Sequence, residues 1–235
     1  MSIKTEQVRI SGAGGEYGGY LAVPEGRKSA PGIVVIQEIF GVNAHMKDVT
    51  ERFAHNGYVA LAPDIFWRTE PGLELGYTPD DIARGREIKG GLDTDALVED
   101  IKGAFATLRA RPECQGRKVG ITGYCFGGFV AYLAACRLDP DASSAFYGGG
   151  IGASLDEAGG ISTPIQFHFG AVDPGIPMSE IDQIKAKVAG KSDAEVFVYD
   201  DADHGFHCDH RGSYQQKAAH TAYARTLSLF AEHLV

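Results

Sequence analysis

The sequence from residue 118 to residue 128 reads Lys-Val-Gly-Ile-Thr-Gly-Tyr-Cys-Phe-Gly-Gly, and it is the strongest indication of the fold in this chain. Its first half is a largely apolar run of the kind found in a strand that is buried on both faces. Cys125 follows, with Gly123 and Gly127 two positions to either side, and an apolar segment typical of a buried helix comes next. A strand-to-helix turn of this tightness leaves no room for a Cβ at the flanking positions. The pattern therefore predicts a nucleophile elbow with the thiol of Cys125 at its apex.

The position of Cys125 also favours the reactive form of its thiol. The partial positive charge at a helix N-terminus stabilises a thiolate, which is the nucleophilic species. The alternative interpretation is a buried cysteine packed among small residues. Cys136 lies further along the same apolar segment without flanking glycines, and it fits that alternative.

Strand-like runs alternate with helical spacing along the rest of the chain. Residues 7–10 and 17–23 surround a glycine-rich turn and predict an N-terminal hairpin. Apolar runs predict strands at 32–36, 58–62, 118–122, 144–147, 165–169 and 195–199. Helical spacing predicts helices at 97–108, 126–138, 181–188 and 218–234. This alternation predicts an α/β fold with a mostly parallel central sheet flanked by helices on both faces.

The length of 235 residues fits a single domain that spans residues 1–235. One stretch, residues 67–95, departs from the alternation because it is rich in glycine, proline and charged residues. Loops of that length are usually functional or form lids. We therefore expect residues 67–95 to be a lid or an inserted segment.

The carboxyl ends of the strands are where such sheets place their ligands. Asp173 follows the predicted strand at 165–169, and His204 follows the predicted strand at 195–199. The chain order nucleophile, acid, histidine is the order of this type of fold. We expect His204 to take the proton of the Cys125 thiol and Asp173 to hold the imidazole in the required tautomer.

Other residues near His204 leave alternatives open. Asp173 precedes a proline and could be a turn residue, and three carboxylates on the histidine's own loop could replace it, namely Asp200, Asp201 and Asp203. A second set superficially suggests a metal site but fits no compact tetrahedral motif: His204, His207, Cys208 and His210. His168, in the middle of a predicted strand, is interpreted as a core histidine. We expect no bound metal.

Composition narrows the class of protein. The net charge of −9 argues against a nucleic-acid surface, which needs basic clusters. The N-terminus lacks the apolar core of a signal peptide, and no apolar run is long enough to span a membrane. The four cysteines are scattered, which favours free thiols in a reducing cytoplasm. We expect a cytoplasmic monomer or small homo-oligomer that acts on a small molecule and binds neither nucleic acid nor membrane.

Together these features resemble the dienelactone hydrolase family of the α/β hydrolases, over nearly the whole chain. Besides the elbow and the Asp173 turn, the resemblance rests on Gln37-Glu38-Ile39-Phe40-Gly41, Ala62-Pro63-Asp64 and Ala202-Asp203-His204-Gly205-Phe206. It implies the α/β-hydrolase fold and a cysteine-dependent hydrolase with a Cys-His-Asp triad. The implied substrate is a small, anionic lactone or ester such as dienelactone, and the implied chemistry needs no metal or organic cofactor.

The resemblance also implies roles for residues outside the triad. Glu38 would contact the resting thiol and accept its proton, although a carboxylate that caps local backbone donors is the alternative. The backbone N–H groups of Phe126 and Ile39 would form the oxyanion hole. Members that act on dienelactone hold its carboxylate with two arginines, one in the lid and one shortly after the histidine.

The arginines of this chain match that pattern only in part. Arg86 would supply the first arginine, with Arg84 as the alternative. The second position falls near Cys208, which is not basic, and Arg211 would substitute for it. A tyrosine and a tryptophan that accompany the first arginine in members of the family are also missing.

Two further functions remain open at this level. One keeps the fold and replaces the substrate by an ordinary carboxylic ester or thioester. The other is a non-catalytic, redox-sensing protein in which Cys125 is oxidised reversibly. No cysteine is adjacent to Cys125 in the sequence to resolve such an oxidised thiol, which counts against the second.

Overall fold

The computed structural model describes residues 1–191 and 193–235. The chain forms two compact units, one made of residues 1–121 with 234–235 and one made of residues 122–233. Strand β5 (Val119–Tyr124) begins in the first unit and ends in the second. The sequence predicts a single domain over residues 1–235. Because that prediction depends on how the two units join, it stays a prediction.

The first unit is built on the N-terminal hairpin. Strands β1 (Ile3–Gly12) and β2 (Gly15–Pro24) pair antiparallel, with Gly12 opposite Gly15, so the predicted hairpin is present and longer than expected. Strand β2 also pairs antiparallel with β4 (Val59–Pro63). Strand β3 (Gly32–Ile36) pairs parallel with β4. All residues of β3 and β4 are buried, as their continuous apolar runs predict.

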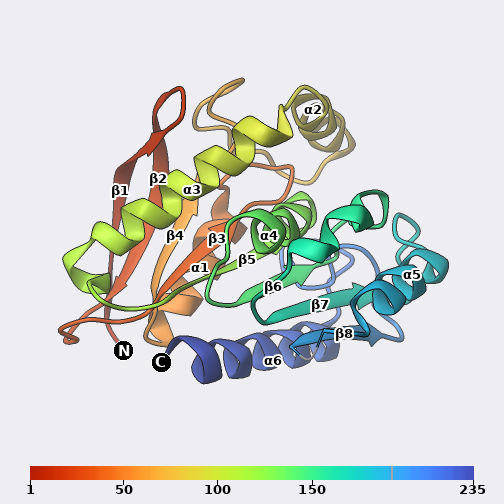
Figure 1. The fold of residues 1–235 in the computed structure, drawn as a ribbon. Helices are drawn as coiled ribbons and strands as arrows, with labels where there is room; N and C mark the ends of the chain where they lie inside the picture. The colour runs from red at the N-terminus through yellow and green to blue at the C-terminus, as the bar shows by residue number, and fades with distance from the viewer. Residues whose placement is uncertain (192) are drawn as a thin grey trace. The chain divides into compact units, whose positions relative to one another are not determined.

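Helices cover both faces of this part of the sheet (Figure 1). The hydroxyl of Tyr17 on β2 donates to the carbonyl of Asp100 on α3 (Thr94–Ala110). The hydroxyl of Tyr20, also on β2, donates to Glu51 on α1 (Ala44–His55). Residues separated by an odd number of positions in a strand point to opposite faces, so α3 and α1 lie on opposite sides of β2. Helix α1 was not predicted from the sequence.

Residues 67–95 are helical in part, and their expected role as a lid or an inserted segment stays a prediction. Helix α2 (Pro79–Gly90) occupies the second half of this stretch, because Thr78 and Asp81 form a reciprocal capping box and Pro79 stands in the first turn. The start of the stretch is held on α3, where the buried carboxylate of Asp100 accepts hydrogen bonds from Trp67 and Arg68. A short 3-10 turn, η1 (Pro112–Cys114), follows α3.

The second unit contains a parallel arrangement of strands. Strands β6 (Ser143–Phe146), β7 (Ile165–Gly170) and β8 (Ala194–Tyr199) pair in that order, and every pair is parallel. The helices of this unit are α4 (Phe126–Arg137), α5 (Met178–Val188) and α6 (Gln216–Leu234), with a 3-10 segment η2 (Gly152–Gly160). These strands and helices match the predicted ones to within a few residues at each end.

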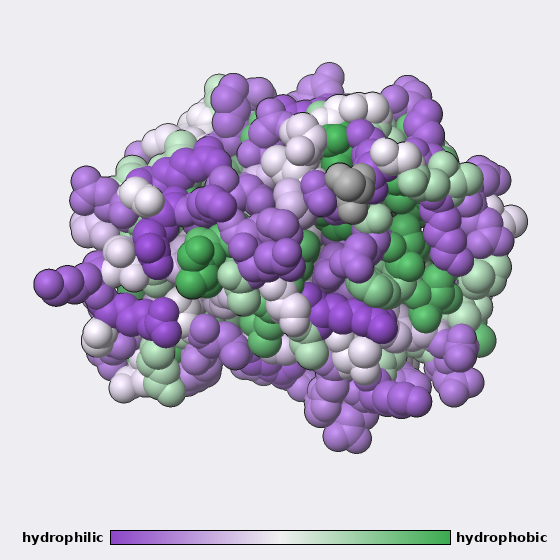
Figure 2. All heavy atoms as spheres, turned by 60° about the horizontal axis from the view of Figure 1, so that its bottom comes forward, coloured by the Kyte–Doolittle hydropathy of each residue, from purple (hydrophilic) through white to green (hydrophobic). Residues whose placement is uncertain are grey.

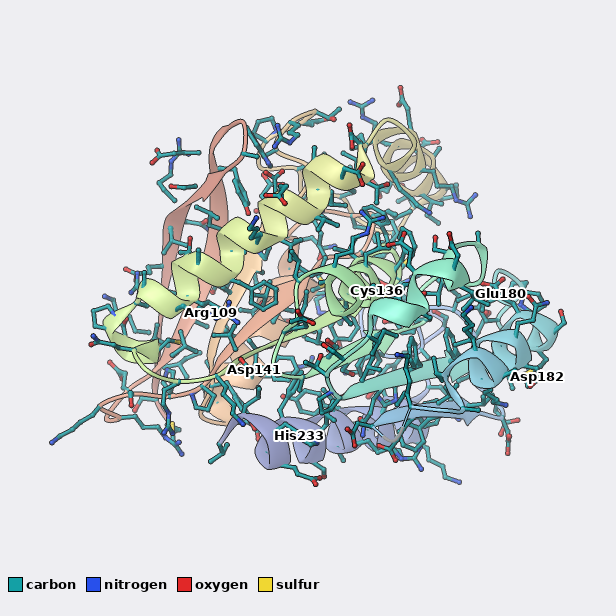
Figure 3. All side chains as sticks on the ribbon, viewed as in Figure 1. Arg109, Cys136, Asp141, Glu180, Asp182 and His233 are labelled. Carbon is teal, nitrogen blue, oxygen red and sulfur yellow. The ribbon has the colours of Figure 1, made fainter. Side chains whose placement is uncertain are left out.

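Alternating side chains of β7 reach helices on both faces of the second unit. Phe167 packs against the ring of Tyr132 on α4. The next residue, His168, contacts Thr226 on α6. Glu180, which lies on α5 (Figure 3), accepts a hydrogen bond from the backbone of Gly152 in η2. The chain therefore has the predicted α/β architecture, with mostly parallel strands and helices on both faces.

Hydrophilic residues dominate the face drawn in Figure 2, where apolar residues form separate smaller areas. Few large apolar side chains are exposed among the described residues: Met1, Val172, Met178 and Val235. Across residues 1–191 and 193–235, none of the helices has the length and the apolar character that a membrane span requires.

Candidate active site

The turn after β5 has the strained geometry that its glycines permit. Cys125 has φ 55° and ψ −117°, in the left-handed region that side chains rarely adopt. A Cβ at Gly123 would lie 1.9 Å from the carbonyl oxygen of Gly127, and one at Gly128 would lie 2.3 Å from that of Phe146. The N–H of Cys125 donates to the same Phe146 carbonyl at 3.0 Å. The turn therefore packs directly on the end of β6, with the thiol at the N-terminus of α4.

Cys125, His204 and Asp173 lie together in the second unit. The Nε2 atom of His204 is 3.0 Å from the sulfur of Cys125, and its Nδ1 atom is 2.7 Å from Oδ2 of Asp173. Asp173 is almost fully buried, and its other oxygen accepts a hydrogen bond from the N–H of Gly175 at 2.7 Å. The three residues follow the ends of β5, β8 and β7, as the carboxyl-edge rule predicts.

The charges of this set stabilise the protonated imidazole. Burial alone would lower the pKa of His204, because it disfavours the charged ring. The negative charge of the Cys125 thiolate and the hydrogen bond to Asp173 outweigh burial and raise the pKa of His204 to about 10. The arrangement therefore favours an imidazolium at His204, which can give a proton to a leaving group during acyl transfer.

The other cysteines have different surroundings. Burial raises the pKa of the Cys136 thiol to about 11 and that of the Cys114 thiol to about 12. Cys136 lies in the last turn of α4 (Figure 3) and Cys208 is fully buried. All four cysteines are free thiols. These surroundings agree with a packing role for Cys136.

One histidine of the set that suggested a metal site, His207, lies among aromatic rings. His207 is buried, with its ring centroid 4.9 Å from that of Tyr124, 5.2 Å from that of Phe146 and 5.9 Å from that of Tyr223. It therefore packs as one ring of an aromatic cluster.

The remaining predicted site residues divide between the units. Glu38 and Ile39 follow β3 in the first unit and are both buried. Arg84 and Arg86 are exposed on α2, and Arg84 forms ion pairs with Glu70 at 2.6 Å and Glu87 at 2.7 Å. Glu38, Ile39 and Arg86 belong to the first unit and the triad to the second. The expected contacts between them therefore stay predictions.

Arg211 lies beside the histidine in the second unit. Gly205, the residue after His204, has φ 78°, and a Cβ placed on it would be 2.4 Å from a guanidinium nitrogen of Arg211. The guanidinium therefore packs on the backbone that carries the imidazole. This is the one arginine of the predicted set that the described contacts bring to the loop of the triad histidine.

Tyr147 is a neighbour of the site that sequence analysis did not single out. Its ring meets that of His204 edge-on, with 5.2 Å between centroids. Its backbone has φ 36°, which is rare for a residue with a side chain. The signal that could have found it is its position at the carboxyl end of β6, directly before three glycines.

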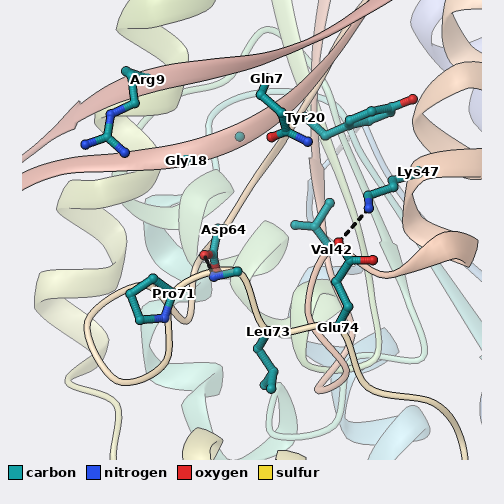
Figure 4. A pocket seen from close by; sticks show the side chains of 12 residues that line it. Gln7, Arg9, Gly18, Tyr20, Val42, Lys47, Asp64, Pro71, Leu73 and Glu74 are labelled. Atoms are coloured by element: carbon teal, nitrogen blue, oxygen red, sulfur yellow. Dashed lines mark hydrogen bonds and ion pairs between the residues drawn. The ribbon is translucent and has the colours of Figure 1, made fainter.

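A separate cleft of about 300 Å³ lies in the first unit (Figure 4). Val42, Pro71 and Leu73 supply apolar surface, and Lys47 and Glu74 form an ion pair at 2.6 Å on its wall. None of the residues predicted to be catalytic or substrate-binding lines this cleft.

Comparison with known proteins gives a consistent result. The model of the dienelactone hydrolase family matches residues 17–234. A Synechocystis protein provisionally named carboxymethylenebutenolidase is 39% identical over 243 residues, covering 100% of this chain and 99% of its own length. The carboxymethylenebutenolidase of Pseudomonas sp. strain P51 is 33% identical, covering 92% of this chain and 90% of its own.

Solved structures agree over the whole chain. A Klebsiella pneumoniae structure provisionally named a dienelactone hydrolase superposes with a TM-score of 0.89 at 28% identity, covering 99% of this chain and 100% of its own. A dienelactone hydrolase-like promiscuous phosphotriesterase, P91, from metagenomic libraries superposes with a TM-score of 0.86 at 25% identity, with full coverage of both chains.

Proposed function

Because the chain belongs to the dienelactone hydrolase family, we propose that it cleaves its ester or lactone substrate with Cys125, His204 and Asp173. Membership gives the α/β-hydrolase fold and a hydrolase that acts on ester or lactone bonds. The observation that carries the proposal is the line of contacts from the Cys125 sulfur to His204 at 3.0 Å and on to Asp173 at 2.7 Å. Such a line supplies a nucleophile, a base and a residue that orients the base.

The reaction follows from the charges of these groups. The Cys125 thiolate attacks the carbonyl carbon, and the resulting oxyanion accepts hydrogen bonds from the backbone N–H groups of Phe126 and Ile39. As the carbon–oxygen bond breaks, the His204 imidazolium gives its proton to the leaving oxygen, which leaves a thioester on Cys125. His204 then takes a proton from water, the hydroxide attacks the thioester, and the carboxylic acid departs as the thiol is regenerated.

Glu38 is proposed to act on the resting enzyme. A buried carboxylate that accepts the proton of Cys125 when substrate arrives would leave the thiolate next to His204. The burial of Glu38, which is 1% exposed, and its position just beyond the carboxyl end of β3 support this role.

The substrate is proposed to carry a negative charge. The guanidinium of Arg211 beside Gly205 would attract a carboxylate to the same loop as His204. Arg86 would supply a second positive charge. Arg84 suits this role less well, because its two ion pairs with Glu70 and Glu87 already engage its guanidinium. A neutral carboxylic ester or thioester is the second candidate substrate. The ion pairs of Arg84 favour it, because they neutralise a positive charge that an anionic substrate would need.

A comparison of substrates and variants tests this function. Hydrolysis of cis- and trans-dienelactone and of p-nitrophenyl acetate would be measured for the wild-type enzyme, Cys125→Ala and the control Cys136→Ala. We expect the wild type and Cys136→Ala to open dienelactone and Cys125→Ala to be inactive. Cleavage of the acetate alone, still dependent on Cys125, would favour the neutral ester. Full activity of Cys125→Ala would refute the mechanism.

A further inference from the structure

One backbone carbonyl, that of Tyr199 at the end of β8, holds both loops that carry the partners of Cys125. It accepts the N–H of Ala171 at 2.9 Å and the N–H of Ala202 at 3.2 Å. Ala171 stands two residues before Asp173, and Ala202 stands two residues before His204. A displacement of this single oxygen would therefore move both loops and change the distance between the imidazole and the carboxylate.

The two loops also bond to each other close to this point. The N–H of Val172 donates to the carbonyl of Ala202 at 3.1 Å. Gly170 leaves space for that contact, because a Cβ there would lie 2.1 Å from the same carbonyl oxygen. The loops thus form one assembly whose attachment to the sheet runs through Tyr199.

A buried chain of hydrogen bonds fixes the phenol of Tyr199. Arg225 donates to the hydroxyl at 3.2 Å, and the hydroxyl is 2.9 Å from Nδ1 of His168. On the far side of the imidazole, Nε2 is 3.3 Å from the hydroxyl of Thr226, which is 2.8 Å from that of Ser144. His168, Thr226 and Ser144 are fully buried. The chain joins α6 to β8, β7 and β6.

Arg225 allows one direction for this chain. A guanidinium can only donate, so the hydroxyl of Tyr199 accepts from it and is able to send its own proton to Nδ1 of His168. In that tautomer His168 carries its hydrogen on Nε2 and donates to Thr226, which donates to Ser144. Burial lowers the pKa of His168 to about 3, and the positive charge of Arg225 acts in the same direction, so the ring stays neutral. The donors and acceptors that join Tyr199 to Ser144 match along this route.

The ring of Tyr199 touches the catalytic loop as well. Its centroid is 5.2 Å from that of Phe206, which lies two residues after His204. Phe206 is 5.2 Å from Tyr147, and Tyr147 is 5.2 Å from His204. A second, apolar route therefore connects the same phenol to the imidazole.

From these contacts we propose that Tyr199 is a positioning residue, held by Arg225 and His168, that sets the distance between His204 and Asp173. The proposal rests on the proposed function of the triad. It assigns no contact with substrate to Tyr199, so a loss of the phenol hydroxyl changes kcat and leaves KM in place. Because the imidazolium depends on its bond to Asp173, the titration of His204 changes too.

Two matched tyrosine variants test this role. Tyr199→Phe removes the hydroxyl from the chain, and Tyr132→Phe removes a buried hydroxyl that donates to the Ser154 carbonyl at 2.8 Å in the same unit. We expect Tyr199→Phe to lower kcat about tenfold with KM unchanged. We expect its His204 resonances to titrate at lower pH than in the wild type. Tyr132→Phe should lose comparable thermal stability and change neither quantity.

Equal losses of activity in both tyrosine variants, or a wild-type kcat and titration in Tyr199→Phe, would overturn the proposal. Cys125→Ala, measured in parallel, separates this failure from failure of the triad. If Cys125→Ala is inactive while Tyr199→Phe behaves as wild type, only the positioning role is wrong. If Cys125→Ala is active, the triad itself is wrong.

Substitutions of Arg225 give an independent test with less risk to folding. Arg225 lines a cleft of about 210 Å³ at the surface, and its guanidinium stacks 4.0 Å from the ring centroid of Phe197. Arg225→Met keeps an apolar stem and loses the donor, whereas Arg225→Lys keeps a donor. We expect Arg225→Met to lower kcat and Arg225→Lys to restore most of it. Equal kcat values for the two variants would contradict the hydrogen-bond route.

Discussion

Two histidines of the second unit, His204 and His168, have pKa values that are shifted in opposite directions. Each has both ring nitrogens within hydrogen-bond distance of a partner. The pKa of His204 is raised to about 10, whereas that of His168 is lowered to about 3. The partners of His204 are a thiolate and a carboxylate, and those of His168 are two hydroxyl groups. The sign of the charge beside the ring therefore decides which histidine is protonated, even though burial acts against the charged form at both.

The arginine near each histidine extends the comparison. Burial keeps the His168 ring neutral, and the positive charge of Arg225, which reaches His168 through the hydroxyl of Tyr199, acts in the same direction. Arg211 packs on Gly205, beside His204, where an anionic substrate would meet it. Arg225 therefore supports the buried hydrogen bonds of His168, and Arg211 belongs to the proposed substrate site. Four measurements test how the surroundings of the two histidines differ.

The largest effect is expected from Asp173→Asn. An asparagine keeps the shape but can donate to Nδ1, which favours the wrong tautomer of His204 and removes the negative charge. We expect kcat to fall about 10³–10⁴-fold. His168→Gln, the matched change at the other histidine, should cost far less activity. Steady-state kinetics of both variants decide this, and similar losses would mean that the two histidines do not differ in role.

The next effect is on the titration of His204. The thiolate of Cys125 is a main cause of its raised pKa, so Cys125→Ser, which has no thiolate, should lower that pKa from about 10. The sign follows because a nearby negative charge favours the protonated ring. Nuclear magnetic resonance of labelled histidine follows the titration directly. An unchanged value in Cys125→Ser would show that the thiolate charge does not act on the imidazole.

A third prediction concerns stability in acid. In the unfolded chain His168 takes up a proton near pH 6.5, whereas in the folded protein it stays neutral down to about pH 3. The unfolded state therefore binds more protons in this window, and stability falls as the pH drops below 6.5. From pH 6.5 to 4.5 this group alone should cost about 2 kcal/mol.

Urea unfolding at several pH values measures this loss of stability. The variant His168→Gln serves as the comparison, because it has no titrating group at position 168. We expect the free energy of unfolding of His168→Gln to fall less steeply with acid than that of the wild type. Parallel curves for the two proteins would rule out a neutral, buried His168 as a source of the acid sensitivity.

The smallest effects are expected from substitution of the two arginines. One substitution should change KM and the other kcat. Arg211→Met should raise KM for an anionic lactone about tenfold and leave KM for p-nitrophenyl acetate unchanged. Arg225→Met should lower kcat and leave both KM values in place. An equal change for charged and neutral substrates in Arg211→Met would remove Arg211 from substrate binding.

Much of the fold could be predicted from the sequence, because local patterns encode it. The glycines around Cys125 predict the tight turn, and the continuous apolar runs predict the buried parallel strands. Helix α1 was missed although its signals are local, with Asn43 as its N-cap and the buried residues Met46, Val49 and Phe53 at helical spacing. The sequence does not readily predict helix α2, because its charged, glycine-rich composition is typical of a loop and the capping box at Thr78 is a short signal.

The surroundings of the site were harder to predict. Chain order and strand ends favour Asp173 and His204, because each follows a different strand of one sheet, although the carboxylates on the loop of His204 share that order. His168 could be interpreted as a core histidine from the sequence. Its hydrogen-bond partners, Tyr199 on β8 and Thr226 on α6, could not be identified, because no sequence pattern connects them to His168. The same holds for Arg211 and Gly205, whose contact depends on the path of a loop. Tertiary hydrogen bonds of this kind become visible only in three dimensions.

Cys125 is proposed to carry the acyl group during turnover, and rapid quenching of the enzyme with excess p-nitrophenyl acetate, followed by peptide mass mapping, locates that group. We predict one acyl group, located on Cys125, that forms in a burst and decays as product is released. The burst should be lost in His204→Ala. Turnover with no acyl group on Cys125, or with one on another residue, would rule out Cys125 as the nucleophile.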